Sequence, residues 1–141
     1  MAEHEFDFRV LSPLGTAFAG KALSVTLPSA DGEITILSNH MPMVSVLTDG
    51  EIRIRTAARE IWIAVSGGFL ETGAAGATVL SDFATEADSI EIARVEAAKE
   101  RAEQLMAEKK ERGELLLVER DLQRAILQLK VAQKIRTRRR S

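Results

Sequence analysis

Few residues of this 141-residue chain have side chains that could do chemistry. There is no cysteine, and the two histidines, His4 and His40, are too few for a zinc site of the usual spacing. His40 lies between two apolar runs, where we expect a loop residue bonded to the backbone. Ser66-Gly67-Gly68 follows a strand-like run, but no helix-forming segment comes after it, so it predicts a tight turn rather than a phosphate-binding loop. The sequence predicts neither a catalytic centre nor a metal site.

Charge is divided unevenly along the chain. Residues 1–88 carry 5 Lys and Arg against 12 Asp and Glu, a net charge of −7, whereas residues 89–141 carry 14 against 9, a net charge of +5. The hydrophobic fraction of 45% is typical of a soluble globular protein. No apolar run approaches the roughly 18 residues needed to cross a bilayer, and the polar first residues do not resemble a signal peptide. We therefore expect a cytoplasmic protein built of two unlike parts.

The first part, residues 1–87, has apolar residues at a period of two, which is typical of strands that bury one face. Turn-forming pairs such as Asp49-Gly50 and Gly67-Gly68 separate the runs, and no helical pattern interrupts them. This pattern predicts an antiparallel sandwich or flattened barrel. The alternating runs are Phe6–Val10, Leu23–Leu27, Ile34–Ile36, Ile52–Arg55 and Ile61–Val65.

The second part, residues 88–141, has the three- and four-residue spacing of helices, so the fold class predicted is α+β, mainly β. The polar segment 84–89 predicts a hinge, within which Asp88 followed by Glu91 resembles a capping box. Gly113 interrupts the pattern, so an antiparallel hairpin of two helices is expected. The apolar stripes are Val95, Ala98, Ala102 and Leu105 on the first helix, and Leu115, Val118, Leu122, Ala125, Leu129 and Ala132 on the second.

A basic end closes the chain, with Arg136, Arg138, Arg139 and Arg140. Cations favour the C-terminus of a helix, so a solvated helix end accounts for them. They also fit a small nucleic-acid-binding module, although five Phe, one Trp and no Tyr leave few rings for base stacking. The residues alone leave both interpretations open, with an enzyme as the third and least supported.

Four segments together resemble a known family. Leu27–Pro42 contains Leu-Pro, then Gly-Glu, an apolar run and Asn-His before proline. Phe8–Pro13, Val65–Glu71 and Val79–Asp82 match further strands and turns in order. Their order and spacing resemble the epsilon subunit of F-type ATP synthases of the bacterial and chloroplast type, and the likeness spans essentially the whole chain.

The resemblance implies a non-catalytic rotor subunit that couples proton translocation to ATP synthesis. It implies a flattened sandwich of about ten strands over residues 1–87 and a helical hairpin over 88–141 that regulates ATP hydrolysis. The implied partners are the gamma subunit, the ring of c subunits and, when the helices extend, the alpha and beta subunits of the catalytic head. Nucleic acid is not among them, and no cofactor is required. The chain would be peripheral on the cytoplasmic face of the cell membrane, held there only through the complex.

Site residues follow from the same resemblance. Glu33 and its loop would face the c-ring, whereas His40, Met41 and Pro42 would lie towards gamma. Some members of the family bind regulatory ATP on the folded hairpin through a motif of an acid, an arginine and further arginines.

The positions of this chain that match the ATP motif are Glu91, Arg94, Arg101 and Arg124. Glu91 stands where the family has Asp, and Gln128 where it has a further Arg. Arginine suits phosphate because its planar fork donates two parallel hydrogen bonds. The structural alternative makes Glu91 a helix cap, with Arg94 and Arg101 as exposed helix charges.

Overall fold

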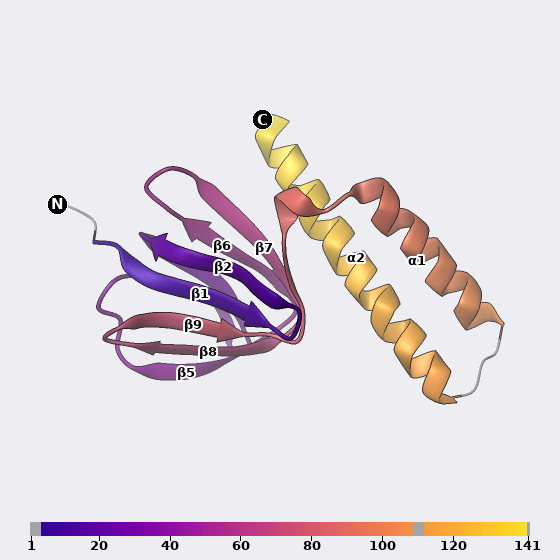
Figure 1. The fold of residues 1–141 in the computed structure, drawn as a ribbon, viewed down its shortest axis with the longest axis horizontal. Helices are drawn as coiled ribbons and strands as arrows, with labels where there is room; N and C mark the ends of the chain where they lie inside the picture. Colours follow the sequence, from indigo (N-terminus) through magenta and orange to yellow (C-terminus); the bar gives the residue numbers. More distant parts are fainter. Residues whose placement is uncertain (1–3, 109–111, 141) are drawn as a thin grey trace. The chain divides into compact units, whose positions relative to one another are not determined.

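A computed structural model describes residues 4–108 and 112–140. The chain forms two compact units, Met1–Ala87 and Asp88–Ser141. Residues 109–111, which join the two helices, lie outside the described residues, as do the side chains of Arg138, Arg139 and Arg140. The first unit is a β domain and the second a helical hairpin (Figure 1).

Ten strands form the described part of the β domain, the number that the family resemblance implies. They are β1 Phe6–Ser12, β2 Gly15–Ala22, β3 Ser24–Ser29, β4 Gly32–Ile36, β5 Met43–Leu47, β6 Gly50–Arg55, β7 Glu60–Val65, β8 Gly68–Gly73, β9 Gly76–Leu80 and β10 Ala84–Glu86. The last of these occupies the start of the predicted hinge, because residues 84–86 pair with β7 instead of leaving the sheet.

One hydrogen-bonded path joins the strands in the order β10-β7-β6-β3-β5-β8-β9-β1-β2, with β4 paired to β3. The two ends of the path, β10 and β2, contact each other, so the sheet curls round into a flattened sandwich. In the described residues β1 and β9 run parallel, and the other pairs are antiparallel as predicted.

The predicted alternation buries one face of most of these strands. It is wrong for β7, where Trp62 and Ala64 are buried as well as Ile61, Ile63 and Val65. In β1 Phe8 and Val10 are fully buried while Asp7 and Arg9 are exposed. Each fully buried aliphatic or aromatic side chain stabilises the fold by about 1.5–3 kcal/mol relative to exposure. The largest fully buried side chains of the core are Phe8, Leu27, Ile36, Ile52, Ile54, Ile63 and Leu70, with Val10, Val25, Val65 and Val79.

The strand directions gather the turns at two opposite ends of the sandwich. Turns 13–14, 30–31, 48–49, 66–67 and 81–83 lie at one end, which we call the Gly67 end. Segments 37–42, 56–59 and 74–75 lie at the other, which we call the His40 end. The two ends present different loops to solvent, so they are separate candidates for contact with partners.

The hairpin consists of α1, Ile92–Ala107, and α2, Arg112–Arg140, which lie side by side (Figure 1). A short 3₁₀ turn, Ala87–Ser89, precedes them. In the described residues no helix combines the length and apolar character needed to cross a membrane.

Two predictions about the helix ends were wrong. The first helix is capped at Glu91, not Asp88, because residues 87–89 form a separate 3₁₀ turn. Gly113 lies inside the first turn of α2, where an exposed glycine is tolerated, so it does not interrupt a helix.

The seam predicted on α2 is confirmed, since all six of its residues are buried or half-buried. On α1 Ala98 is exposed, contrary to the prediction, and the half-buried Lys99 lies in the inward stripe. A lysine stem can cover apolar surface while its charge stays in water, and the Lys99 ammonium lies 3.9 Å from Glu103. The buried face of α1 therefore includes Lys99 in place of Ala98, which apolarity alone does not predict.

Two glycines allow a test of the packing at the Gly67 end. Gly68 has φ +122°, and a Cβ there would overlap the carbonyl oxygen of Leu80. Gly15 has a similar φ of +130°, but nothing lies within 4 Å of its Cβ position. We expect Gly15→Ala to cost about 1–3 kcal/mol from backbone strain, and Gly68→Ala to cost about 1–3 kcal/mol more from the clash. Urea unfolding followed by the fluorescence of Trp62, the only tryptophan, measures both. Equal losses would contradict the close approach of β8 to Leu80.

Candidate partner-binding surface

An exposed apolar row crosses the outer face of the β domain. Val46 on β5 pairs with Phe69 on β8, and Phe69 pairs with Leu80 on β9. Their exposed fractions are 54%, 55% and 53%, although all three side chains are large and apolar. Leu80 pairs in turn with the half-buried Leu11 on β1. We call these four residues the apolar row.

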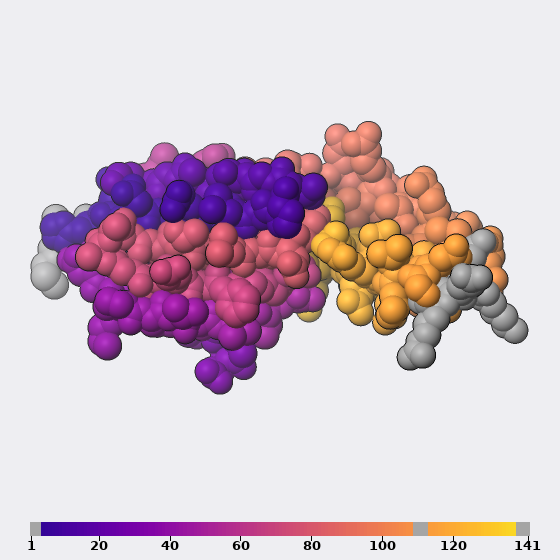
Figure 2. All heavy atoms as spheres, turned by 60° about the horizontal axis from the view of Figure 1, so that its bottom comes forward, coloured from indigo at the N-terminus to yellow at the C-terminus, as the bar shows by residue number. Residues whose placement is uncertain are grey.

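Adjacent strands place the members of the row close enough to form one surface, because directly paired residues have Cβ atoms about 4.5–5.5 Å apart. Figure 2 views this face, with β1 and β2 in indigo, β8 and β9 in rose, and β5 in purple. The row lines a shallow hollow of about 460 Å³ together with Ser12, Pro13, Gly68, Ser81 and Asp82. Contiguous exposed apolar surface of this kind marks an interaction site.

The apolar surface continues along β5 towards the His40 end. Val44, two residues from Val46 and therefore on the same face, is 71% exposed. Met41, just before the strand, is 76% exposed. The exposed apolar face of β5 therefore extends from Val46 to Val44, and Met41 adds an exposed apolar side chain in the loop before the strand, residues 37–42, which we call the His40 loop.

A hydrogen-bonded turn holds the row at the Gly67 end. The buried Ser81 donates its backbone N–H to the Leu11 carbonyl over 2.9 Å, which ties β9 to β1. Its hydroxyl lies 2.8 Å from the carbonyl oxygens of both Gly67 and Phe83. These bonds fix the backbone beside Leu80, so the row is presented by rigid strands.

The apolar row was not predicted from the sequence. A signal was present, because Val46-Leu47, Phe69-Leu70 and Val79-Leu80 place apolar residues side by side in strands. Neighbours in a strand point to opposite faces, so such pairs predict strands that are apolar on both faces. One of those faces must stay outside the core of a domain this small.

The His40 loop lies at the opposite end of β4 from Glu33. The His40 Nδ1–H donates to the Met41 carbonyl over 2.9 Å, which confirms the expected loop histidine bonded to the backbone. His40, Met41 and Pro42 thus form one local group, with Leu37 (56% exposed) beside it in sequence. Near them the hydrogen bond from Lys21 to Asp7, 2.9 Å long, raises the pKa of the Lys21 ammonium.

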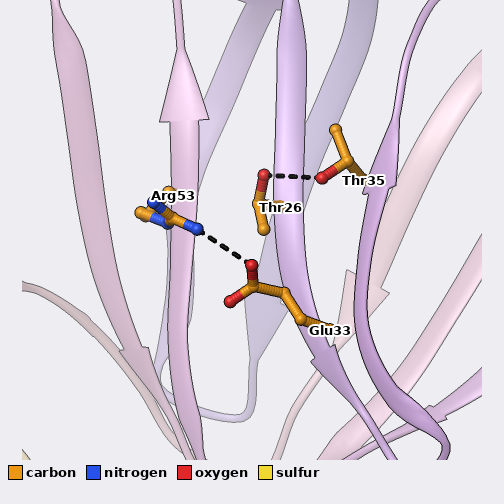
Figure 3. A network of polar contacts seen from close by, with 4 residues as sticks. All are labelled: Thr26, Glu33, Thr35 and Arg53. Atoms are coloured by element: carbon orange, nitrogen blue, oxygen red, sulfur yellow. Dashed lines mark hydrogen bonds and ion pairs between the residues drawn. The ribbon is translucent and has the colours of Figure 1, made fainter.

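Glu33 takes part in an ion pair on the face that β3, β4 and β6 turn away from the core (Figure 3). Its carboxylate lies 3.1 Å from the guanidinium of Arg53 on β6, across the intervening β3. The Arg53 guanidinium also lies 5.5 Å from the Trp62 ring centroid, within range of a cation–π contact. Thr26 and Thr35 share a 3.0 Å hydrogen bond on the same face. The structure thus separates Glu33 from His40, Met41 and Pro42.

Of the four nucleotide candidates, the structure brings Glu91 and Arg94 together. The Arg94 Nε lies 3.9 Å from the Glu91 carboxylate, and both side chains are largely exposed. Glu91 occupies the cap position of α1, but its side chain makes no capping hydrogen bond. Arg101 is exposed two turns further along the same face of α1.

Arg124 is half-buried on α2. A groove of about 560 Å³ between the two helices is lined by Glu96, Glu100 and Glu103 among others, and by none of the four candidates. Its lining holds three carboxylates against two lysines, Lys99 and Lys130, and no arginine, so it is a poor cradle for a triphosphate.

Comparison with known families identifies the family to which the chain belongs. The family description "ATP synthase, Delta/Epsilon chain, beta-sandwich domain" matches residues 5–87, and the corresponding long alpha-helix domain matches residues 88–133. The ATP synthase epsilon chain of Dehalococcoides mccartyi is 40% identical over 137 residues, 96% of each chain. That of Syntrophobacter fumaroxidans is 40% identical over 134 residues, 95% of this chain and 99% of the relative. The chain belongs to the ATP synthase epsilon-chain family.

Solved structures support the fold of this family for the chain. A chain in the cryo-EM structure of Euglena gracilis mitochondrial ATP synthase, titled OSCP/F1/c-ring in rotational state 1, matches with a TM-score of 0.61 and 15% identity. The match covers 94% of this chain and 80% of that chain. A chain in the Tetrahymena thermophila mitochondrial ATP synthase central stalk/c-ring matches with a TM-score of 0.51 and 11% identity, over 63% and 72% of the two chains. At these identities the likeness concerns the fold alone.

Proposed function

We propose that the chain is a non-catalytic rotor subunit in the central stalk of an F-type ATP synthase, where it couples proton translocation to ATP synthesis. The supporting observation is the apolar row with its continuation along β5, a surface that a partner must cover to remove it from water. Family membership makes the gamma subunit the partner of choice, with the His40 loop at one edge of the contact. The chain is then peripheral on the cytoplasmic face of the cell membrane, through the complex.

Rigidity is the mechanical requirement of such a role. Torque passes from a ring to a shaft only through an element that does not deform, and a sheet that curls until its ends meet has few free edges to slip. The close packing of the core residues adds to this stiffness. The β domain therefore suits the transmission of torque.

Glu33 fits the proposed contact with the c-ring. The Glu33 side chain is 66% exposed and that of Arg53 is 30% exposed, and a pair at the surface contributes about 1 kcal/mol or less. A cationic group on the ring could therefore replace Arg53 at small cost. Because Glu33 lies near the Gly67 end and His40 at the other, one rigid domain can contact two partners at once.

The proposed docking on gamma depends on Phe69. Phe69→Ser removes the central aromatic ring of the row, and we expect at least a tenfold loss of affinity for purified gamma, since aromatic anchors at the centre of an interface contribute most. The fold should survive because the side chain is 55% exposed.

Leu116→Ser provides the matched control, because Leu116 is similarly apolar and 62% exposed but lies on α2. Isothermal calorimetry measures both affinities. An unchanged affinity of the Phe69 variant, or an equal loss in the control, would refute docking through the row.

We further propose that the helical hairpin inhibits ATP hydrolysis by rearranging and extending towards the alpha and beta subunits. Within α1, every residue of which the structure describes, Ala102 is the only buried residue, and the apolar Ile92, Val95, Leu105 and Met106 are half-buried, so the helix packs on its neighbour mainly through partly exposed side chains. At about 25 cal/mol per Å² such a seam stabilises the hairpin weakly. Deleting residues 88–141 should raise the ATP hydrolysis rate of the reconstituted complex while the β domain still binds gamma. A rate that stays the same would contradict the inhibitory role.

ATP is proposed as a regulatory ligand of the hairpin, with no cofactor required for the stalk role. Arg94, Arg101 and Arg124 would supply guanidinium groups to the phosphates, and the long Glu91–Arg94 contact would open at little cost. We expect weak binding, detectable by calorimetry at millimolar ATP and lost in Arg94→Ala. Absence of heat with the unmodified chain would remove these four residues from consideration.

A further inference from the structure

Thr72 is a buried polar residue at the His40 end. It lies on β8 between the exposed Glu71 and the half-buried Gly73, and only 6% of it is accessible. Buried hydroxyl groups are nearly always hydrogen-bonded. The Thr72 hydroxyl donates to the Met41 carbonyl over 2.6 Å and accepts the Met43 N–H over 3.0 Å.

These two bonds lie on either side of Pro42. Proline has no N–H to donate, so the ladder between β5 and β8 cannot continue regularly through this residue. The ladder indeed begins at Met43, which pairs with Thr72. One side chain thus holds the backbone on both sides of Pro42, at the point where regular pairing stops.

The Met41 carbonyl has a second donor, the His40 Nδ1–H at 2.9 Å. A carbonyl oxygen has two lone pairs, so Thr72 and His40 together fill its capacity. A neutral imidazole that donates from Nδ1 has Nε2 as an acceptor, and the bond sets the orientation of the ring. The position of the Met41 carbonyl therefore determines which ring nitrogen of His40 carries the proton.

We propose that Thr72 is a positioning residue of the His40 loop: its hydroxyl fixes the Met41 carbonyl, which in turn holds His40 in the Nδ1–H tautomer with Nε2 presented as an acceptor to gamma. The role in recognition rests on the proposed function, whereas the effect on His40 belongs to the isolated chain. Thr72 touches no partner in this scheme and acts through Met41 and His40.

Three variants of the full chain test the proposal. Thr72→Val keeps the shape and the branched Cβ but removes both hydrogen bonds, and Thr72→Ser keeps the hydroxyl. Thr35→Val makes the same hydroxyl-to-methyl change at an exposed position of β4, where the hydroxyl bonds to Thr26 and not to the His40 loop. Nitrogen-15 NMR of the ring nitrogens reports the tautomer, and His40→Gln assigns the signals against those of His4. Thermal unfolding confirms that each variant is folded.

We expect a protonated Nδ1 in the unmodified chain, in Thr72→Ser and in Thr35→Val, and a shift towards protonated Nε2 in Thr72→Val. Affinity for gamma should fall about tenfold in Thr72→Val and stay within about twofold in the other two. An unchanged tautomer in folded Thr72→Val would overturn the proposal, as would a changed tautomer with unchanged affinity. Failure of the unmodified chain to bind gamma would instead overturn the proposed function, and the NMR result would still decide the role of Thr72 within the loop.

Discussion

The structure of the β domain depends on one geometric constraint: a closed sheet has a single interior, and each strand can bury only one of its two faces there. Most strands satisfy it with polar outer faces, as β1 does with Asp7 and Arg9. β5, β8 and β9 do not, because Val46, Phe69 and Leu80 are apolar on the side that the core cannot take. A partner that covers this side would remove these residues from water. In the isolated chain they stay exposed as the apolar row.

The same constraint relates stability to function. The core residues make the sandwich rigid, and rigidity is what a torque-bearing part needs. The row and the exposed apolar residues Val44 and Met41 supply a docking surface, while Glu33, near the Gly67 end on β4, carries a weakly held charge. The hairpin has the opposite character, since Ala102 is the only buried residue of α1 and the other apolar residues of its inward stripe are half-buried. A rigid β domain and a weakly packed helical hairpin are the two elements expected of the proposed rotor subunit with a regulatory hairpin.

Much of the fold could be predicted from the sequence. The alternating runs gave the strands because burial of one face requires a period of two, and the spacing of Leu122, Ala125 and Leu129 gave the seam of α2. The parallel pairing of β1 with β9 could not be predicted, because periodicity carries no information about which distant strands pair. The helix start at Glu91 was missed because 3₁₀ and α turns share the same local residue preferences.

The candidate site was harder to predict than the fold. The bond of His40 to the backbone was expected from its place in a loop, and the structure has it. The hydroxyl of Thr72 was missed because its partners lie about thirty residues away in the chain, at Met41 and Met43. The apolar row was missed because exposure of an apolar residue depends on what the closed sheet leaves uncovered. The side chains of Arg138, Arg139 and Arg140 lie outside the described residues, so both interpretations of the basic end, a solvated helix end and a nucleic-acid contact, stay predictions.

The central claim is that gamma covers the apolar row and Met41. Hydroxyl-radical footprinting with mass spectrometry tests it most directly, because it compares the solvent access of individual side chains in the free chain and in the complex with gamma. We expect strong protection of Met41 and Phe69 on binding, with Leu116 and Leu117 of α2 modified to the same extent in both samples. Equal modification of Met41 and Phe69 in the free and bound chain would contradict the claim.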